Sequence, residues 1–159
     1  MLALGVVGAR AMAEMASAMP SLLYMTSLSL GDNNLGDEGV EALSIGLKES
    51  KSLATLDLSN HSMLSTRFGP KGATALASAI AVIGSLTSLD LSGNILGGYY
   101  DGQKDKMIYT PEGPKAIADA LLVNGSLTKL DVWDNRLGDK GKDPIRKAVD
   151  GREGFHLQM

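Results

Sequence analysis

The sequence contains no cysteine, which excludes a disulfide framework and any metal site built on thiolates. It also lacks an apolar run of the roughly 20 residues that a membrane-spanning helix needs, so we expect no direct insertion into a membrane. The formal net charge of -3 provides no basic field that would attract nucleic acid. Phosphate loops, zinc-ligand spacings and nucleophile elbows are missing too, so we expect neither a cofactor nor catalysis.

The composition is that of one globular domain around one core. The 159 residues are 44% hydrophobic and 21% charged, and only 4% are aromatic. The first residues are apolar, but Arg10 and Glu14 interrupt them and no basic region precedes them, unlike in a secretory signal. We therefore expect a cytoplasmic location or an organelle interior rather than secretion.

Four segments of the chain repeat one pattern of apolar residues. In each segment two apolar residues stand two positions apart, as in a strand that buries one face. These pairs are Leu28/Leu30, Leu56/Leu58, Leu89/Leu91 and Leu130/Val132. A glycine further on begins a stretch with apolar residues at helical spacing. Because a lone strand and helix cannot bury these faces, we expect the four units to stack.

The link between strand and helix varies in length. The unit is 28 residues long from Leu28 to Leu56, and the next two steps are 33 and 41 residues. The extra residues fall in the same link of the second and third units, near 64–68 and 97–110. Stacking would place both insertions on one edge of the array, one above the other.

The best-formed copies of the pattern carry a family resemblance. "LTSLDLSGN" (Leu86 to Asn94) and "LGDEG" (Leu35 to Gly39) resemble the leucine-rich repeat of the ribonuclease-inhibitor type, and the resemblance covers residues 25–149. It implies an α/β leucine-rich repeat solenoid. In such a right-handed βα superhelix, parallel strands line the concave face and helices line the convex face.

The resemblance also predicts how the chain is divided. We expect a single leucine-rich repeat domain over 1–159. It would consist of an N-terminal capping half-repeat (1–24), four repeats (25–149) and a C-terminal capping strand (150–159).

A polar residue stands three positions after the second strand apolar residue of each unit. The four are Asn33, His61, Asn94 and Asn135. An amide side chain both donates and accepts, so we expect this row to satisfy backbone groups buried in the turns. His61 departs from the row, but an imidazole can still donate one hydrogen bond, so we interpret it as a structural histidine with a hydrogen-bond partner.

The residue between the two strand apolar positions should face the concave surface. In three units it is Asp57, Asp90 or Asp131, and carboxylates on adjacent strands, roughly 5 Å apart, should raise one another's pKa. Two interpretations remain open: solvated surface residues, or contacts for a basic partner. Trp133, the only tryptophan, takes a place that glycine or serine holds elsewhere. It either binds a partner or covers the end of the core.

The insertion at 97–110 holds three of the four tyrosines. Tyr99, Tyr100, Met107, Ile108 and Tyr109 bring aromatic and apolar surface to an edge that is otherwise polar. A tolerated flexible loop is the alternative, because a long loop costs little extra entropy. We favour a partner-binding loop, since loops without a function are usually polar.

Together these patterns favour a non-enzymatic protein–protein interaction module that binds another protein through its edge loops and concave face. At this length it would suit an accessory subunit of a larger complex. The alternative is a GTPase-activating protein for a small GTPase, because Ran GTPase-activating protein resembles this repeat type. In that case Arg67, in the second insertion, is the residue to examine.

Overall fold

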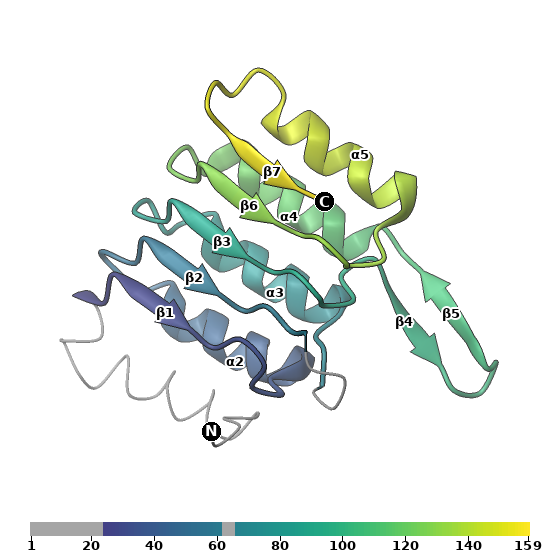
Figure 1. The fold of residues 1–159 in the computed structure, drawn as a ribbon. Helices are drawn as coiled ribbons and strands as arrows, with labels where there is room; N and C mark the ends of the chain where they lie inside the picture. The colour runs from purple at the N-terminus through teal and green to yellow at the C-terminus, as the bar shows by residue number, and fades with distance from the viewer. Residues whose placement is uncertain (1–23, 62–65) are drawn as a thin grey trace.

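The repeats form two layers, a parallel sheet and a row of helices, as Figure 1 shows. The computed structural model describes residues 24–61 and 66–159, so the half-repeat predicted for 1–24 lies outside the described residues except for Tyr24. The strands lie in the order β1-β2-β3-β6-β7, and neighbouring strands are parallel. They span Ser27–Ser29 (β1), Thr55–Asp57 (β2), Ser88–Asp90 (β3), Lys129–Asp131 (β6) and His156–Gln158 (β7).

A helix follows each of the first four strands of this sheet and packs behind it. The helices span Gly36–Leu47 (α2), Pro70–Ile80 (α3), Glu112–Val123 (α4) and Gly138–Val149 (α5). This arrangement confirms the predicted α/β solenoid with parallel strands. Across 24–61 and 66–159, none of the helices has both the length and the apolar character that crossing a membrane requires.

The leucine spacing sets the register of the sheet. Leu28, Leu56, Leu89, Leu130 and Leu157 lie directly opposite one another on successive strands. The three central leucines are at most 1% exposed. Burying one such side chain stabilises the fold by about 1.5–3 kcal/mol. A slip of one residue would turn these side chains to solvent, so the hydrophobic pattern admits this register alone.

Asparagines join neighbouring turns, as the sequence predicted. Asn94 is fully buried, and its Nδ2 donates to the carbonyl oxygens of Leu58 (2.9 Å) and Leu91 (3.0 Å). Asn135 Nδ2 likewise donates to the carbonyl oxygen of Leu91 at 2.8 Å. Each of these amides therefore satisfies a carbonyl group of the preceding repeat.

His61 is hydrogen-bonded, with Nε2 3.1 Å from Ser92 Oγ, but it does not fill the buried position that asparagine holds in the other turns. The imidazole is exposed, whereas the preceding Asn60 is 5% exposed. Asn60 Nδ2 donates to the carbonyl oxygen of Thr66 at 3.3 Å. The link after β2 is longer than in the first and fourth repeats, so the turn departs from the usual path and Asn60 supplies the buried amide.

At the opposite edge of the array, side chains from the next repeat donate hydrogen bonds to backbone carbonyl groups. Asn124 Nδ2 donates to the carbonyl oxygens of Ile80 (2.7 Å) and Ile83 (3.1 Å) near the end of α3. Arg152 Nη1 donates to the carbonyl oxygen of Leu121 in α4 at 3.1 Å. Carbonyl groups that a helix end leaves without intrahelical partners thus acquire them from the adjacent unit.

A carboxylate in the first turn of α2 caps the next helix. Asp37 Oδ1 accepts hydrogen bonds from the backbone N–H groups of Gly69 (2.8 Å) and Gly72 (2.7 Å) at the start of α3. Gly69 has no side chain with which to form the cap itself. The cap is therefore supplied by the neighbouring repeat, where the positive end of the α3 dipole favours a carboxylate.

We expect Asp37→Ala to lower the free energy of unfolding by about 1–2 kcal/mol, because two N–H groups lose their acceptor. Urea unfolding followed by circular dichroism measures the change. Asp139→Ala is the matched control, since Asp139 holds the same position in α5 but is exposed, and among the described residues strand β7 rather than a helix follows α5. Equal losses in the two variants would contradict the capping role.

Candidate functional site

The insertion at 97–110 folds into an antiparallel hairpin that projects from one edge of the solenoid (Figure 1). Its strands are β4 (Gly98–Asp101) and β5 (Lys106–Tyr109). At its base, Gly97 N donates to the carbonyl oxygen of Asn135 at 3.1 Å, and Thr110 N donates to that of Gly97 at 2.9 Å. A Cβ on Gly97 would lie 2.4 Å from the carbonyl oxygen of Arg136, so this close approach requires glycine.

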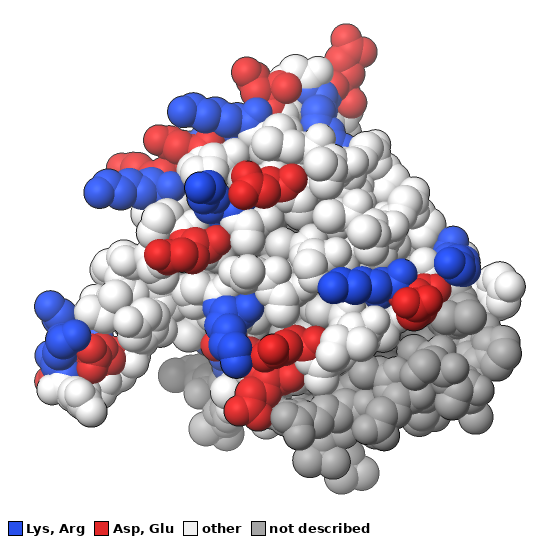
Figure 2. Space-filling view, turned by 180° about the vertical axis from the view of Figure 1, so that it is seen from behind, with Lys and Arg blue, Asp and Glu red and all other residues white. Residues whose placement is uncertain are grey.

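The tip of the hairpin is polar and internally bonded. Asp101 Oδ1 accepts from the backbone N–H groups of Gln103 (3.0 Å) and Lys104 (3.2 Å), and Lys104 Nζ lies 3.1 Å from Asp101 Oδ2. The bond to the Lys104 side chain is the main reason that the pKa of Asp101 lies below its usual value. Tyr100 Oη donates to Asp105, which raises the pKa of the phenol. Viewed from the helical side, the charges of the hairpin gather at this tip (Figure 2).

The two faces of the hairpin carry different apolar pairs. Tyr99 lies opposite Ile108, and Tyr100 opposite Met107, so consecutive pairs point to opposite faces. The tyrosines are well exposed: 47% for Tyr99, 58% for Tyr100 and 67% for Tyr109. A two-stranded hairpin cannot bury both of its own faces, and this aromatic surface therefore faces solvent.

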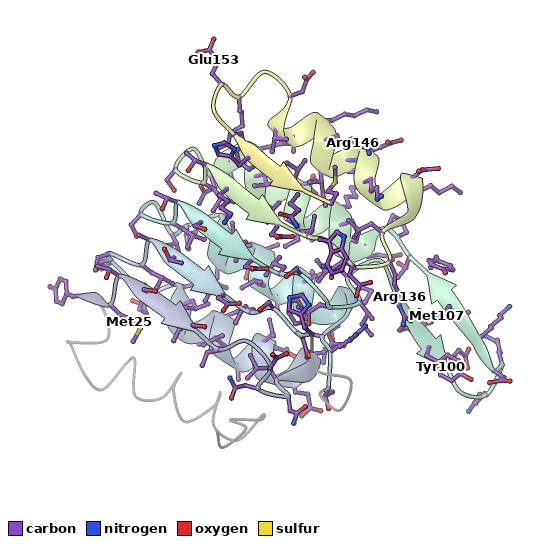
Figure 3. The ribbon with its side chains drawn as sticks, in the orientation of Figure 1. Met25, Tyr100, Met107, Arg136, Arg146 and Glu153 are labelled. Carbon is purple, nitrogen blue, oxygen red and sulfur yellow. The ribbon has the colours of Figure 1, made fainter. Side chains whose placement is uncertain are left out.

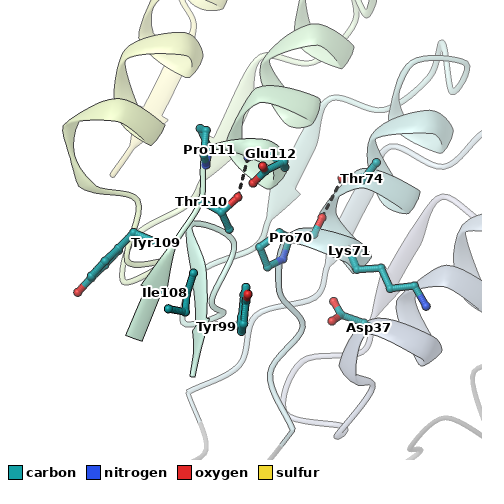
Figure 4. A pocket seen from close by; sticks show the side chains of 10 residues that line it. All are labelled: Asp37, Pro70, Lys71, Thr74, Tyr99, Ile108, Tyr109, Thr110, Pro111 and Glu112. Atoms are coloured by element: carbon teal, nitrogen blue, oxygen red, sulfur yellow. Dashed lines mark hydrogen bonds between the residues drawn. The ribbon is translucent and has the colours of Figure 1, made fainter. Parts of the chain in front are cut away.

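An open groove of about 600 Å³ separates one hairpin face from the start of α3 (Figure 4). Tyr99 and Ile108 line its hairpin side, and Pro70 and Lys71 line its helix side. Lys71 forms an ion pair with Glu41 at 3.1 Å. The groove thus combines an apolar wall with a charged rim.

The concave-face aspartates lie in the predicted row. Asp57, Asp90 and Asp131 are directly opposite one another on β2, β3 and β6. Each accepts a hydrogen bond from the backbone N–H two residues later, at 3.0, 2.9 and 2.9 Å respectively. The carboxylates therefore also shape the chain where each strand ends.

The expectation that these carboxylates raise one another's pKa is wrong for Asp57. Partial burial tends to raise the pKa of this carboxyl group, but hydrogen bonds from Ser59 and Ser29 outweigh burial and lower it. Ser59 Oγ donates to Oδ1 and Ser29 Oγ donates to Oδ2, both at 2.7 Å. Hydroxyl donors on both sides stabilise the ionised form.

Trp133 lies on the surface two residues after the end of β6 and is 50% exposed. Its ring centroid is 6.4 Å from that of His61, at a tilt of 43°. His61 Nε2 lies 3.1 Å from Ser92 Oγ, and Ser92 Oγ donates to Asp90 Oδ1 at 2.6 Å. Because the serine hydrogen points to the aspartate, the imidazole must be the donor in its bond to Ser92.

This chain of bonds differs from that of a serine nucleophile. A nucleophilic serine donates to a histidine, whereas here the serine donates to the carboxylate and is 3% exposed. Among residues 24–61 and 66–159, no group of three or more His, Asp or Glu side chains could hold a metal ion. Arg67 is half-buried beside the buried Phe68.

The insertions of the second and third repeats lie in links that meet at one edge. Residues 62–65 lie outside the described residues, but Thr66 accepts at its carbonyl oxygen from Gly36 N at 3.2 Å. Phe68 accepts in the same way from Ile95 N at 3.1 Å. The hairpin therefore leaves the solenoid beside the link of the preceding repeat.

Comparison with known families identifies the repeat. The family model of the leucine-rich repeat matches residues 21–44 and 123–142. The chain therefore carries leucine-rich repeats, and their strand–helix units are of the ribonuclease-inhibitor-like type. Among curated protein sequences, no relative matches the chain.

Two solved structures share the fold at low sequence identity. Actin-binding site 2 of leiomodin-1 superposes with a TM-score of 0.67 and 21% identity, over 94% of this chain and 76% of that one. The C-terminal domain of tropomodulin, from work on Caenorhabditis elegans, has a TM-score of 0.66 and 17% identity, over 91% of this chain and 81% of that one. The protein thus resembles the leucine-rich repeat domains of these two proteins in fold.

The structure adds residues that the sequence patterns did not single out. Pro70 and Lys71 complete the groove because α3 begins beside the hairpin. Arg136 contacts Met107, 29 residues away in sequence. The sequence could have indicated Arg136 in one way. Arg136 directly follows the buried Asn135, and the repeat spacing puts Asn135 on the same edge as the insertion.

We expect Asp57 to titrate below its usual pKa of 3.8. Since the folded-state pKa is lowered, Asp57 stabilises the fold above the unfolded value, and this contribution is lost as the pH falls through the folded pKa. Carboxyl NMR titration measures the pKa directly. Ser59→Ala should raise it, whereas Ser92→Ala, the matching change beside Asp90, should not. An Asp57 pKa at or above 3.8 in the unaltered protein would show the hydrogen bonds to be ineffective.

Proposed function

We propose that this protein is a non-enzymatic protein-binding module, with the hairpin as its principal contact. The observation that carries the proposal is the exposure of three tyrosines, 47% to 67%, on an internally hydrogen-bonded hairpin outside the core. Tyrosine offers a large contact area at low conformational cost, and it is enriched where proteins bind each other. Met107 and Ile108 extend the apolar surface on the two faces.

The concave face contributes a second contact area in this proposal. Trp133 supplies a half-exposed aromatic ring, and Asp57, Asp90 and Asp131 supply a row of carboxylates for polar or basic groups of the partner. The hydrogen bonds within the row hold the carboxylates in place before binding, which reduces the entropy lost on association. A projecting hairpin beside such a face also suits a subunit anchored in a larger assembly.

Actin is the first defined protein to test as a partner. It is named by one of the similar structures, actin-binding site 2 of leiomodin-1, although the resemblance at 21% identity concerns the fold. Purified monomeric actin can be titrated against the chain by isothermal calorimetry. If the unaltered chain releases heat on binding actin and the variant Tyr100→Ser, Tyr109→Ser does not, actin is a partner. If the unaltered chain gives no heat of binding, actin is eliminated.

We expect the double variant Tyr100→Ser, Tyr109→Ser to weaken partner binding at least about tenfold, because each ring loses its apolar contact. Cross-linking in extracts of the native source, followed by mass spectrometry, identifies partners of the unaltered chain, and titration with the purified partner gives the affinity. Tyr24→Ser is the matched control, since Tyr24 and Tyr109 are both 67% exposed and Tyr24 is not in the hairpin.

The binding comparison requires that the double variant be as stable as the unaltered chain. Both tyrosines are exposed and lie outside the core, and the bond that Tyr100 donates to Asp105 is itself exposed. The free energy of unfolding of the double variant should therefore stay within about 1 kcal/mol of that of the unaltered chain. If it folds normally and binds its partner with undiminished affinity, the hairpin is not the binding element.

A further inference from the structure

Arg136 joins the hairpin to the solenoid. It follows Asn135 in the turn after β6, with a φ of 53°, in the left-handed region that arginine seldom adopts. Its Nη1 donates to Sδ of Met107 at 2.9 Å, and Figure 3 shows the side chain directed toward the hairpin. The corresponding residue of the first repeat is Asn34, with a φ of 56° and a side chain that suits this conformation. A long cation thus occupies a turn position where a short polar residue fits more easily.

The same arginine lines a second depression, of about 280 Å³, between the end of β6 and the start of α5. Trp133 and Lys142 line it as well. Two carboxylates, Asp134 and Asp139, also lie in its wall. Nevertheless, no ion pair joins Arg136 or Lys142 to any other residue that the structure describes. Arg136 therefore faces both this depression and the Met107 face of the hairpin.

We propose that this surface, formed by Tyr100, Met107, Trp133, Arg136 and Lys142, binds an acidic segment of the partner protein. In that segment an aspartate or glutamate side chain lies next to apolar side chains. The carboxylate contacts Arg136, and the apolar side chains cover Tyr100, Met107 and Trp133. This inference rests on the proposed function, since it specifies the chemistry of the partner at the hairpin.

The hydrogen-bonding capacity of the Arg136 guanidinium favours a carboxylate as the occupant. A guanidinium has five N–H donors in a planar fork that matches a carboxylate, and the thioether sulfur of Met107 is only a weak acceptor for one of them. Lys142 adds a second positive charge to the same depression, and Asp134 and Asp139 balance the two charges without forming an ion pair with either cation. Apolar side chains packed around the pair would exclude water and strengthen the bond. Arginine, tryptophan, tyrosine and methionine are also the residue types enriched at the centres of protein interfaces.

The test uses the intact chain and a phage-displayed library of random 12-residue peptides. Peptides enriched on the unaltered chain should carry aspartate or glutamate next to apolar residues. Trp133 is the only tryptophan, so its fluorescence reports binding of synthetic, tryptophan-free versions of these peptides. Arg136→Gln should weaken binding at least about tenfold. Arg146→Gln is the control, because Arg146 is an exposed arginine of α5 that lines neither depression.

Reversing the charge of Arg136 tests directly whether the peptides are selected by their acidic residues. Arg136→Glu should enrich peptides with lysine or arginine in place of the acidic residue. Peptides without an acidic preference, binding unaffected by Arg136→Gln, or a library that yields no binder would each overturn the inference. If bound peptides are lost in the Tyr100→Ser, Tyr109→Ser variant but not in Arg136→Gln, the hairpin proposal stands and only its acidic partner is wrong. Binding that persists in both variants would contradict both proposals.

Discussion

The register between neighbouring strands is the constraint on which the rest of the structure depends. Leu56, Leu89 and Leu130 are buried opposite one another, and each step along the sheet repeats this contact. Because side chains alternate between the two faces, the same register places Asp57, Asp90 and Asp131 on the concave side. Burial of the leucines therefore also determines where the polar surface lies.

Polar side chains also link neighbouring repeats at both edges of the array. Asn94 and Asn135 bond to carbonyl groups of the preceding repeat, and Asp37 caps the helix of the following one. Asn124 reaches back to the end of α3. Buried backbone groups that one repeat cannot satisfy are thus satisfied by its neighbours, as expected for units that are not stable alone. The hairpin consequently emerges from an edge that hydrogen bonds hold in place.

The solenoid could be predicted from the sequence because leucines that need burial and asparagines that bond backbone groups of the turns recur at fixed spacings. The position and the apolar character of the 97–110 insertion were also evident, whereas its antiparallel pairing was not, since no repeat supplied a template for it. The sequence did not predict that Asn60, rather than the residue at position 61, supplies the buried amide of the second repeat, because a longer link changes the turn locally. The Arg136–Met107 contact depends on a left-handed backbone conformation, which spacing alone does not reveal.

The tolerance of the strand-to-helix link has a consequence for engineering. From the turn residue to the buried glycine in the first turn of the helix, the chain advances six residues from Asn33 to Gly39 and nineteen from Asn94 to Gly113. The leucines on either side nevertheless keep the same alignment. Chain length at this edge is therefore decoupled from the packing of the core. The short links 33–35 and 135–137, which end where α2 and α5 begin, become natural acceptor sites for grafted peptides. A scaffold with two or three recognition loops could thus be assembled on one side of the molecule.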